Sequence, residues 1–249
     1  MSLTPLVQVD QPLAGLSPGQ VVALDRAQHH HLTGVLRLRA HDPVEVTDGR
    51  GGHAVGELTP EGIALGVGAT VEPAPSPALR VVHGLPKGRK LDEVVRVLTE
   101  LGVDELQPVA AARSLRRPEG ERADRAVVRW QAVARAAGEQ ARRRHRLHVA
   151  PIVAVDDLEV TGGWLLAHPG AGSGLPRCLA ELREHLDAGD LEALTIAVGP
   201  EGGWSDDEVA RLTAGGARAA HLGPSVLRTE HAAAAAAAVC SAWLGRWGV

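Results

Sequence analysis

Hydrophobic and polar positions divide the chain into two parts with different periods. Residues 1–72 carry short alternating runs of the kind that form β-strands, and Asp48-Gly49 predicts a hairpin turn between two of them. The runs that predict strands are Val21–Leu24, Val44–Thr47, His53–Leu58 and Ile63–Val71. A proline-rich segment, residues 72–78, interrupts the pattern. We therefore predict a small β domain over residues 1–72 and a second domain over residues 73–249.

Beyond that segment, apolar runs of strand length alternate with stretches of helical period. The predicted strands are Leu79–Leu85, Glu105–Ala111, Trp164–His168, Leu194–Val198 and Ala217–Leu222. The predicted helices run from about Arg89 to Gly102, over Glu121–Arg144, over Leu175–Leu186, from Ser205 to Gly215 and over His231–Trp243. Strands that alternate with helices in this way are typical of an α/β domain with a parallel sheet.

Two glycine-proline loops follow strand ends near the C-terminus. The first, Gly199-Pro200-Glu201-Gly202-Gly203, precedes Ser205 and Glu208, whose spacing predicts a capping box at a helix start. The second runs from Gly223 to Glu230. Glycines in such turns let backbone N–H groups come close to a bound ligand. The two loops are thus the strongest candidates for a binding site.

The sequences of these loops, GPEGGW and LGPSVLRTE, closely resemble those of the RsmE-type ribosomal RNA methyltransferases, a branch of the SPOUT methyltransferases. The resemblance implies a C-terminal trefoil knot that holds S-adenosylmethionine. Residues 29–51 are similar to the PUA-like N-terminal domain of the same family, which implies a small β-barrel there. Two residues depart from the family pattern: His231 replaces a threonine, and Ala141 replaces a serine.

The resemblance also implies a reaction and its partners. The expected reaction is methylation of N3 of a uridine, the family's uridine 1498, in 16S ribosomal RNA of the small ribosomal subunit. The sulfonium of S-adenosylmethionine is already activated, so no metal is expected. The family further implies a homodimer. The small side chains of Ala232–Ala238 let another backbone approach closely, which suits either burial inside the knot or a subunit interface.

Site residues follow from the motifs that match. Arg228 is the candidate for stabilising negative charge on the base, and Glu201, Glu230 and Glu139 are candidates for taking the proton, with no choice among them. The residues expected to bind the cofactor are Leu166, His168, Gly199, Pro200, Glu201, Gly202, Leu222, Gly223, Val226, Leu227 and Arg228.

Charge is unevenly distributed along the chain. The formal net charge is −4, yet residues 113–146 hold eleven arginines against four acidic residues. Such a patch predicts contact with RNA phosphates. Within it, Glu139, Gln140 and Arg143 match a Glu-Gln-Ser-x-Arg motif of the family. The candidate RNA contacts are Arg37, Arg39, Lys87, Arg142 and Arg143, with Lys90 beside Lys87 as a further one.

Other features limit the class of protein. Cys178 and Cys240 have no spacing typical of a zinc site or of a disulfide framework, and no partner acid or cysteine accompanies His29–His31 at ligand spacing. No apolar run reaches the length of a membrane span, and the N-terminus does not resemble a secretion signal. We therefore expect a cytoplasmic protein.

Two alternatives stay open. The strand Trp164–His168 with its glycine-rich loop is also typical of a Rossmann-type dinucleotide enzyme, although Leu175 stands where the third glycine of that motif belongs. The other alternative is a non-catalytic RNA-binding or ribosome-assembly protein with the same fold. His231 and Ala141 keep that alternative open.

Overall fold

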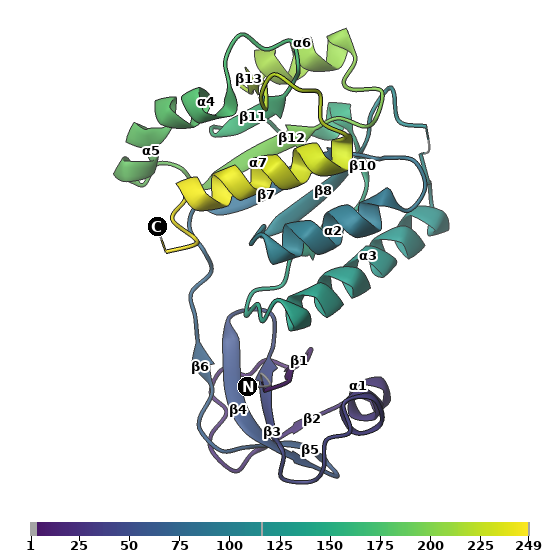
Figure 1. Cartoon of the computed structure of the whole chain (residues 1–249), viewed down its shortest axis with the longest axis vertical. Coiled ribbons are helices and arrows are strands. Elements are labelled where there is room, and N and C mark those ends of the chain that lie inside the picture. Colours follow the sequence, from purple (N-terminus) through teal and green to yellow (C-terminus); the bar gives the residue numbers. More distant parts are fainter. Residues whose placement is uncertain (1–3, 116, 249) are drawn as a thin grey trace. The chain divides into compact units, whose positions relative to one another are not determined.

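The computed structural model describes residues 4–115 and 117–248, which form two units (Figure 1). Among the described residues, one unit contains residues 4–74 together with 138–146, and the other contains residues 75–115 and 117–137 together with 147–248. The first unit is therefore completed by a short segment from the middle of the chain. The sequence pattern did not predict that segment's place.

The first unit is built on a six-stranded sheet. Its strands are β1 (Leu6–Gln8), β2 (Val21–Ala23), β3 (Pro43–Thr47), β4 (Gly52–Thr59), β5 (Gly62–Leu65) and β6 (Thr70–Val71), in the order β1-β3-β4-β5-β2, with β6 against β4. All pairings are antiparallel except β1 with β3. Inward side chains such as Val22, Val44, Val46 and Ile63 are fully buried. Alternate burial along β4 confirms the period of two that predicted these strands.

Three short elements described in this unit are absent from the sequence prediction. Strand β1 is only three residues long, and α1 (Arg26–His30) continues into a π-helix over His31–Val35. Elements this short carry no measurable period. The predicted run Ile63–Val71 is divided into β5 and β6 by Gly66-Val67-Gly68.

The segment Gly138–Arg146 is held to the first unit by backbone and charged contacts. Gly51 N–H donates to Arg144 O at 3.0 Å, and Arg146 N–H donates to Gly49 O at 2.9 Å. The Arg142 guanidinium donates to Thr4 O at 2.7 Å and pairs with Glu45. Part of the arginine-rich stretch therefore has a structural role.

The second unit contains a seven-stranded sheet in which every pairing is parallel, as predicted. Its strands are β7 (Ala78–Gly84), β8 (Glu105–Ala110), β9 (His148–Val149), β10 (Val153–Ala154), β11 (Trp164–Ala167), β12 (Ala193–Val198) and β13 (Arg218–Ala220). The order is β10-β8-β7-β12-β11-β13, with β9 against β8. In the common Rossmann order the fourth strand adjoins the first. Here β12 adjoins β7, and β11 lies beyond it.

Helices surround this sheet close to their predicted places. They are α2 (Lys90–Glu100), α3 (Glu121–Gln140), α4 (Leu175–Glu181), α5 (Arg183–Ala188), α6 (Asp206–Ala214) and α7 (Thr229–Trp243), with a short 3-10 helix, η2, over Val155–Asp157. The predicted Leu175–Leu186 helix is divided at Leu182, and α3 ends four residues before Arg144. The Ser205–Glu208 capping box of α6 is confirmed. Helix α7 begins at Thr229, so Glu230 lies in its first turn.

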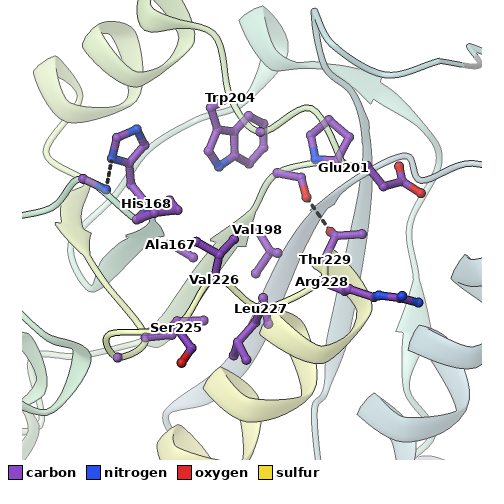
Figure 2. Close-up of a pocket in the computed structure, with 18 of the residues that line it drawn as sticks. Ala167, His168, Val198, Glu201, Trp204, Ser225, Val226, Leu227, Arg228 and Thr229 are labelled. Carbon is purple, nitrogen blue, oxygen red and sulfur yellow. Dashed lines mark hydrogen bonds between the residues drawn. The ribbon is translucent and has the colours of Figure 1, made fainter.

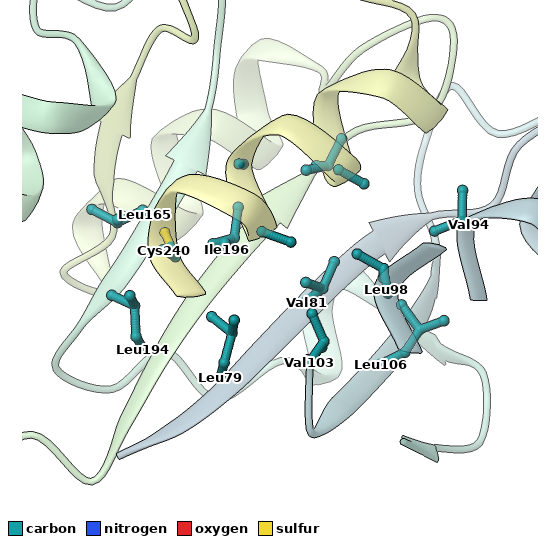
Figure 3. Close-up of a cluster of buried hydrophobic side chains, with 14 of the residues drawn as sticks. Leu79, Val81, Val94, Leu98, Val103, Leu106, Leu165, Leu194, Ile196 and Cys240 are labelled. Carbon is teal, nitrogen blue, oxygen red and sulfur yellow. The ribbon is translucent and has the colours of Figure 1, made fainter. Parts of the chain in front are cut away.

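Adjacent residues of the central strands face opposite sides of the sheet and form separate cores. Val81 and Ile196 pack with α2 and α7 residues on one side, whereas Val82 and Ala197 pack with Trp204 and α6 residues on the other. Figure 3 shows the first of these clusters. Long apolar runs in β7 and β12 are explained by burial on both faces.

Alanines bring α7 close to the sheet. Ala233, Ala236 and Ala237 are fully buried, and α7 contacts both β7 and β12 beside α2 (Figure 1). A larger side chain at a fully buried position has no room to occupy. The alanine run therefore serves packing within the described chain.

We predict that Ala236→Leu lowers the free energy of unfolding by about 1–3 kcal/mol, because overpacking a dense core forces side chains and backbone apart. Ala235 is exposed one residue earlier on the same helix and gives a matched control. Ala235→Leu is expected to change stability by less than about 0.5 kcal/mol. Urea denaturation of both variants measures the difference, and equal midpoints would contradict this account of α7.

Candidate functional site

A cavity of about 610 Å³ lies at the carboxyl ends of β11, β12 and β13. Its walls come from the loops that follow these strands and from the first residues of α7. Parallel strands end at one edge of their sheet, which brings together loops far apart in sequence. Figure 2 shows His168 and Trp204 on one side of the site and the segment from Ser225 to Thr229 on the other. The volume is within the usual range of about 300–1,000 Å³ for small-molecule sites.

Most residues predicted to bind a cofactor meet at this cavity. His168, Gly199, Pro200, Glu201, Leu222, Gly223, Val226, Leu227 and Arg228 all line it. Two predicted residues are outside the lining. Leu166 is fully buried in β11 and packs in the core beside α6, and Gly202 faces Arg113, since a Cβ at Gly202 would lie 2.9 Å from Arg113 Cβ.

The lining also contains residues that were not predicted as cofactor contacts, among them Lys90, Arg113 and Trp204. Arg113 donates hydrogen bonds to Gly202 O at 3.2 Å and to Trp204 O at 2.9 Å, and so fixes the 199–204 loop. Trp204 could have been indicated from sequence by its place at the end of the GPEGGW motif. Arg113 follows a different strand, β8, and no spacing connects it to this loop.

The 199–204 loop is tightly folded on itself. Gly203 N–H donates to Pro200 O at 2.8 Å, and Gly203 has a φ of 68°, which glycine adopts without strain. A Cβ at Gly199 would lie 3.0 Å from Trp204 N. The loop's own backbone geometry therefore explains why positions 199 and 203 are glycines.

Trp204 brings an unused donor to the cavity. Its side chain is buried, and its indole Nε1 has no hydrogen-bond partner among the residues that the structure describes. A buried donor without an acceptor costs free energy, so an acceptor on a bound ligand would satisfy it. Val198, Leu222 and Val226 add apolar surface nearby.

Histidines close two of the strand-end loops in the same way. His168 Nδ1 accepts from Gly170 N–H at 3.2 Å, and His221 Nδ1 accepts from Gly223 N–H at 3.2 Å. Each ring thereby folds back the turn that follows its strand. In both rings the acceptor role leaves Nε2 as the protonated nitrogen.

Charged groups collect at one edge of the cavity. Lys90 Nζ lies 3.0 Å from Glu201 Oε1 and 3.5 Å from Glu230 Oε1. Arg228, by contrast, is exposed, lines the cavity and pairs with no acidic side chain of the described residues. An exposed guanidinium without an internal partner is ready to meet a negatively charged group.

A buried histidine connects this edge with the sheet. His83, at the end of β7, is fully buried; its Nδ1 donates to Gly84 O at 2.7 Å, and its Nε2 lies 3.3 Å from Thr229 Oγ1. The Thr229 hydroxyl donates to Gly199 O at 2.5 Å. Burial lowers the pKa of His83, against the opposing effect of its hydrogen bonds and of the Glu201 and Glu230 carboxylates.

A lowered histidine pKa makes stability depend on pH with a definite sign. Below the ordinary histidine pKa of about 6.5, His83 is protonated in the unfolded chain but stays neutral in the folded chain. The free energy of unfolding therefore decreases as the pH falls below that value. We predict that this residue contributes up to about 1.4 kcal/mol of destabilisation per pH unit in that window. The free energies of unfolding of the unsubstituted protein and of His83→Gln, compared between pH 7.5 and 5.5, isolate the contribution of His83 to this pH dependence. Identical slopes in the two proteins would contradict a neutral, buried His83.

The remaining candidates have these surroundings. Glu139 belongs to the first unit, where its Oε1 accepts from Gln8 N–H at 2.9 Å. Arg37 and Arg39 follow the π-helix, and Arg37 has a φ of 59°. Lys87 is exposed. Arg142 is engaged with Glu45. Arg116 of the basic patch lies outside the described residues.

Metal and membrane features give negative findings. Across residues 4–115 and 117–248, no group of three or more His, Cys, Asp or Glu side chains is placed to hold a metal ion. Of the helices in those ranges, none combines the length and the apolar character needed to cross a membrane.

Comparison with known families gives two matches. Residues 72–241 match the model of an RNA methyltransferase domain, and residues 24–62 match that of an RNA methyltransferase PUA domain. The first match contains every residue that lines the cavity. With the strand order above, it overturns the Rossmann alternative for the strand Trp164–His168.

Individual proteins are similar over nearly the whole chain. The chain is 32% identical to ribosomal RNA small subunit methyltransferase E of Mycobacterium bovis, over 92% of this chain and 89% of that protein. It is also 32% identical to the protein of the same name from Synechocystis, over 90% of this chain and 73% of that protein. A crystal structure of ribosomal RNA small subunit methyltransferase E from Neisseria gonorrhoeae bound to S-adenosyl methionine has a TM-score of 0.82 at 26% identity, covering 96% of this chain and 98% of that one.

Proposed function

This chain belongs to the RNA methyltransferase family and has its PUA domain, and we propose that it methylates N3 of a uridine in 16S ribosomal RNA, the family's uridine 1498, with S-adenosylmethionine as donor. The relatives named as small-subunit methyltransferases and the relative bound to S-adenosyl methionine support the substrate and the donor. The observation that carries the proposal is the cavity at the ends of β11, β12 and β13, lined by both C-terminal motifs.

The cavity fits a ligand with one polar, nucleoside-like end and one apolar side. S-Adenosylmethionine, when bound, supplies a methyl group already activated on a sulfonium. Trp204 Nε1–H is an orphaned buried donor for such a ligand, and Val198, Leu222 and Val226 provide apolar contact. Gly199 and Gly223 both line the cavity, so main chain without a side chain borders the ligand there, and backbone N–H and C=O groups commonly fix orientation in small-molecule sites.

The chain's own charged groups suit the acceptor base. Loss of the imide proton from N3 spreads negative charge onto the neighbouring carbonyls of uracil. Arg228, exposed and unpaired at the cavity, would donate hydrogen bonds to that charge as it develops. Glu201 and Glu230 are the proposed acceptors of the proton on this edge, and Glu139 stays a candidate from its motif alone.

RNA contacts are proposed at exposed and half-buried cations. Arg37 and Arg39 lie in the PUA-containing unit, and Lys87 lies beside the cavity-lining Lys90. Arg143 and Arg142 remain proposed contacts in the motif after α3, with Arg142 also serving its pair with Glu45. Phosphate contacts of this kind position the RNA without reading its sequence.

A test of the function uses RNA from cells that lack the protein. Mass spectrometry of 16S ribosomal RNA is expected to show the loss of one N3-methyluridine, restored by the unsubstituted protein. In vitro, the purified protein with labelled S-adenosylmethionine is expected to label free 16S RNA or small subunits lacking the modification. Binding of RNA and cofactor with no transfer to either would instead favour the non-catalytic RNA-binding alternative.

Three features implied by the family remain proposals. These are the C-terminal trefoil knot, a homodimer and a cytoplasmic location. Val239 and Trp247 are exposed apolar residues on and after α7 that support a subunit contact. Sedimentation equilibrium tests the dimer directly, and a monomer at micromolar concentration would overturn it.

A further inference from the structure

One ammonium group is shared by two carboxylates from distant parts of the chain. Lys90, in the first turn of α2, lies 3.0 Å from Glu201 of the 199–204 loop and 3.5 Å from Glu230 in the first turn of α7. The Glu230 side chain is 15% exposed and that of Glu201 is 31% exposed, so solvent screens the cluster only in part. Three segments that build the cavity therefore meet at this one cation.

The two carboxylates are satisfied to different degrees. Both oxygens of Glu201 accept from Lys87 N–H, at 3.1 and 3.2 Å, in addition to the contact with Lys90. In Glu230, Oε2 is buried without a hydrogen-bond partner among the described residues, and Lys90 approaches the other oxygen. Removal of Lys90 would therefore leave the largely buried carboxylate of Glu230 without a paired cation. Glu201 would keep its hydrogen bonds from Lys87 N–H.

Glu230 is also close in sequence to the cation assigned to the reaction. Arg228 is the N-cap residue of α7, and Glu230 follows it by two residues in the first turn. Anything that fixes the carboxylate of Glu230 therefore fixes the helix start from which Arg228 extends. Lys90 does this from α2, a helix that packs against α7.

We infer that Lys90 is a positioning residue for methyl transfer, which ties the 199–204 loop to the first turn of α7 and so holds Arg228 in place at the cavity. This inference rests on the proposed function. From sequence alone, the position of Lys90 beside Lys87 suggests contact with RNA. The inference gives Lys90 a different role. A misplacement of about 1 Å in such a site can cost on the order of a hundredfold in rate.

The charges around the cluster agree with this arrangement. Hydrogen bonding to Glu201 raises the pKa of Lys90. Burial acts to raise the pKa of Glu230, yet its own backbone N–H and Lys90 hold it below the ordinary value, with a smaller contribution from His231. The pKa of Glu201 is likewise lowered, against burial, by its own backbone N–H, Lys90 and Lys87 N–H. The Glu201 and Glu230 carboxylates also act to raise the pKa of the buried His83, against the larger effect of its burial.

The sign of the effect follows from these directions. A carboxylate with a depressed pKa stays ionised above that value and loses its stabilising contacts as the pH falls through it. Without Lys90 the carboxyl of Glu230 keeps its burial but loses its nearest positive charge, so its pKa rises. The acid limb of any activity that needs an ionised Glu230 then moves to higher pH.

The test compares Lys90→Met with Lys90→Arg and with Lys87→Met. Lys87 is the matched control, because only its backbone N–H contacts Glu201 and a side-chain replacement leaves that donor intact. Single-turnover methylation at saturating cofactor and RNA is measured from pH 5 to 9. We expect Lys90→Met to slow transfer by about tenfold or more near neutral pH and to shift the acid limb upward. Lys90→Arg should restore both. Lys87→Met removes a proposed RNA contact, so its effect is expected in the RNA concentration needed for half-maximal rate and not in the position of the acid limb.

A second measurement does not depend on turnover. The carboxyl ¹³C shifts of labelled glutamates report the titration of Glu230 in the protein without ligands, and Lys90→Met should raise its midpoint. If Lys90→Met fails to fold, Lys90→Gln takes its place. An unchanged Glu230 titration, or a defect confined to the RNA concentration needed for half-maximal rate, would overturn the inference. Failure of the unsubstituted protein to transfer a methyl group would refute the proposed function, while the titration still decides the role of Lys90.

Discussion

Arg228→Ala is expected to lower the rate of methyl transfer by about a hundredfold or more, with little change in cofactor affinity. The reason is that a guanidinium facing the uracil carbonyls meets little charge in the ground state and a developing anion in the transition state. Removing one preorganised donor of this kind costs roughly 10²–10³ in turnover. Arg228 has no acidic partner among the described residues, so its loss leaves no buried charge unpaired.

The competing explanation is that Arg228 pairs with Glu230 to hold the loop shut. In the structure the cation paired with Glu230 is Lys90, which weakens that explanation. Single-turnover rates at saturating cofactor and RNA separate the two roles, with calorimetry of S-adenosylmethionine binding beside them. A normal transfer rate in Arg228→Ala, once both ligands saturate, would show that the residue is structural.

Much of the fold was predictable because its long elements carry strong periods. Helix α2, with Leu91, Val94, Val95 and Leu98 buried, lies where the helical spacing predicts it. The apolar runs of β7 and β12 predicted strands of a parallel sheet correctly. The two-residue strands β9 and β10 have no period to find. The placement of Gly138–Arg146 with the first unit depends on long-range contacts such as Gly51 with Arg144, which local patterns do not encode.

Some residues of the candidate site could be predicted from local sequence, whereas others are brought to it only by long-range contacts. Gly199, Pro200 and Gly223 were recognisable because a turn at a strand end needs residues of this type. Arg113 and Lys90 reach the cavity from β8 and α2 through the topology of the sheet. Gly202 shows the limit of reasoning from a motif: it was expected to approach a ligand, yet its open side faces Arg113.

Gly84→Ala is expected to weaken binding of S-adenosylmethionine by about a hundredfold, the largest effect predicted for a residue that does not line the cavity. A Cβ at Gly84 would lie 2.4 Å from Pro200 Cδ and 2.5 Å from Pro200 N, and real Cβ atoms do not approach backbone so closely. Gly84 is the last residue of β7, an inner strand, so the 199–204 loop must give way. Its displacement moves Glu201 and Trp204 together.

Gly172→Ala is the matched control, because a Cβ there meets nothing within 4 Å and its φ is not in the positive region. Calorimetry of cofactor binding measures the affinity of both variants, and urea denaturation shows whether each is folded. Overpacking at Gly84 is also expected to cost about 1–3 kcal/mol of stability, so affinity is compared well below the unfolding midpoint. The loop after β12 cannot keep its position beside a methyl group at residue 84. A folded Gly84→Ala protein that binds S-adenosylmethionine as tightly as Gly172→Ala would therefore show that this loop does not form the cofactor site.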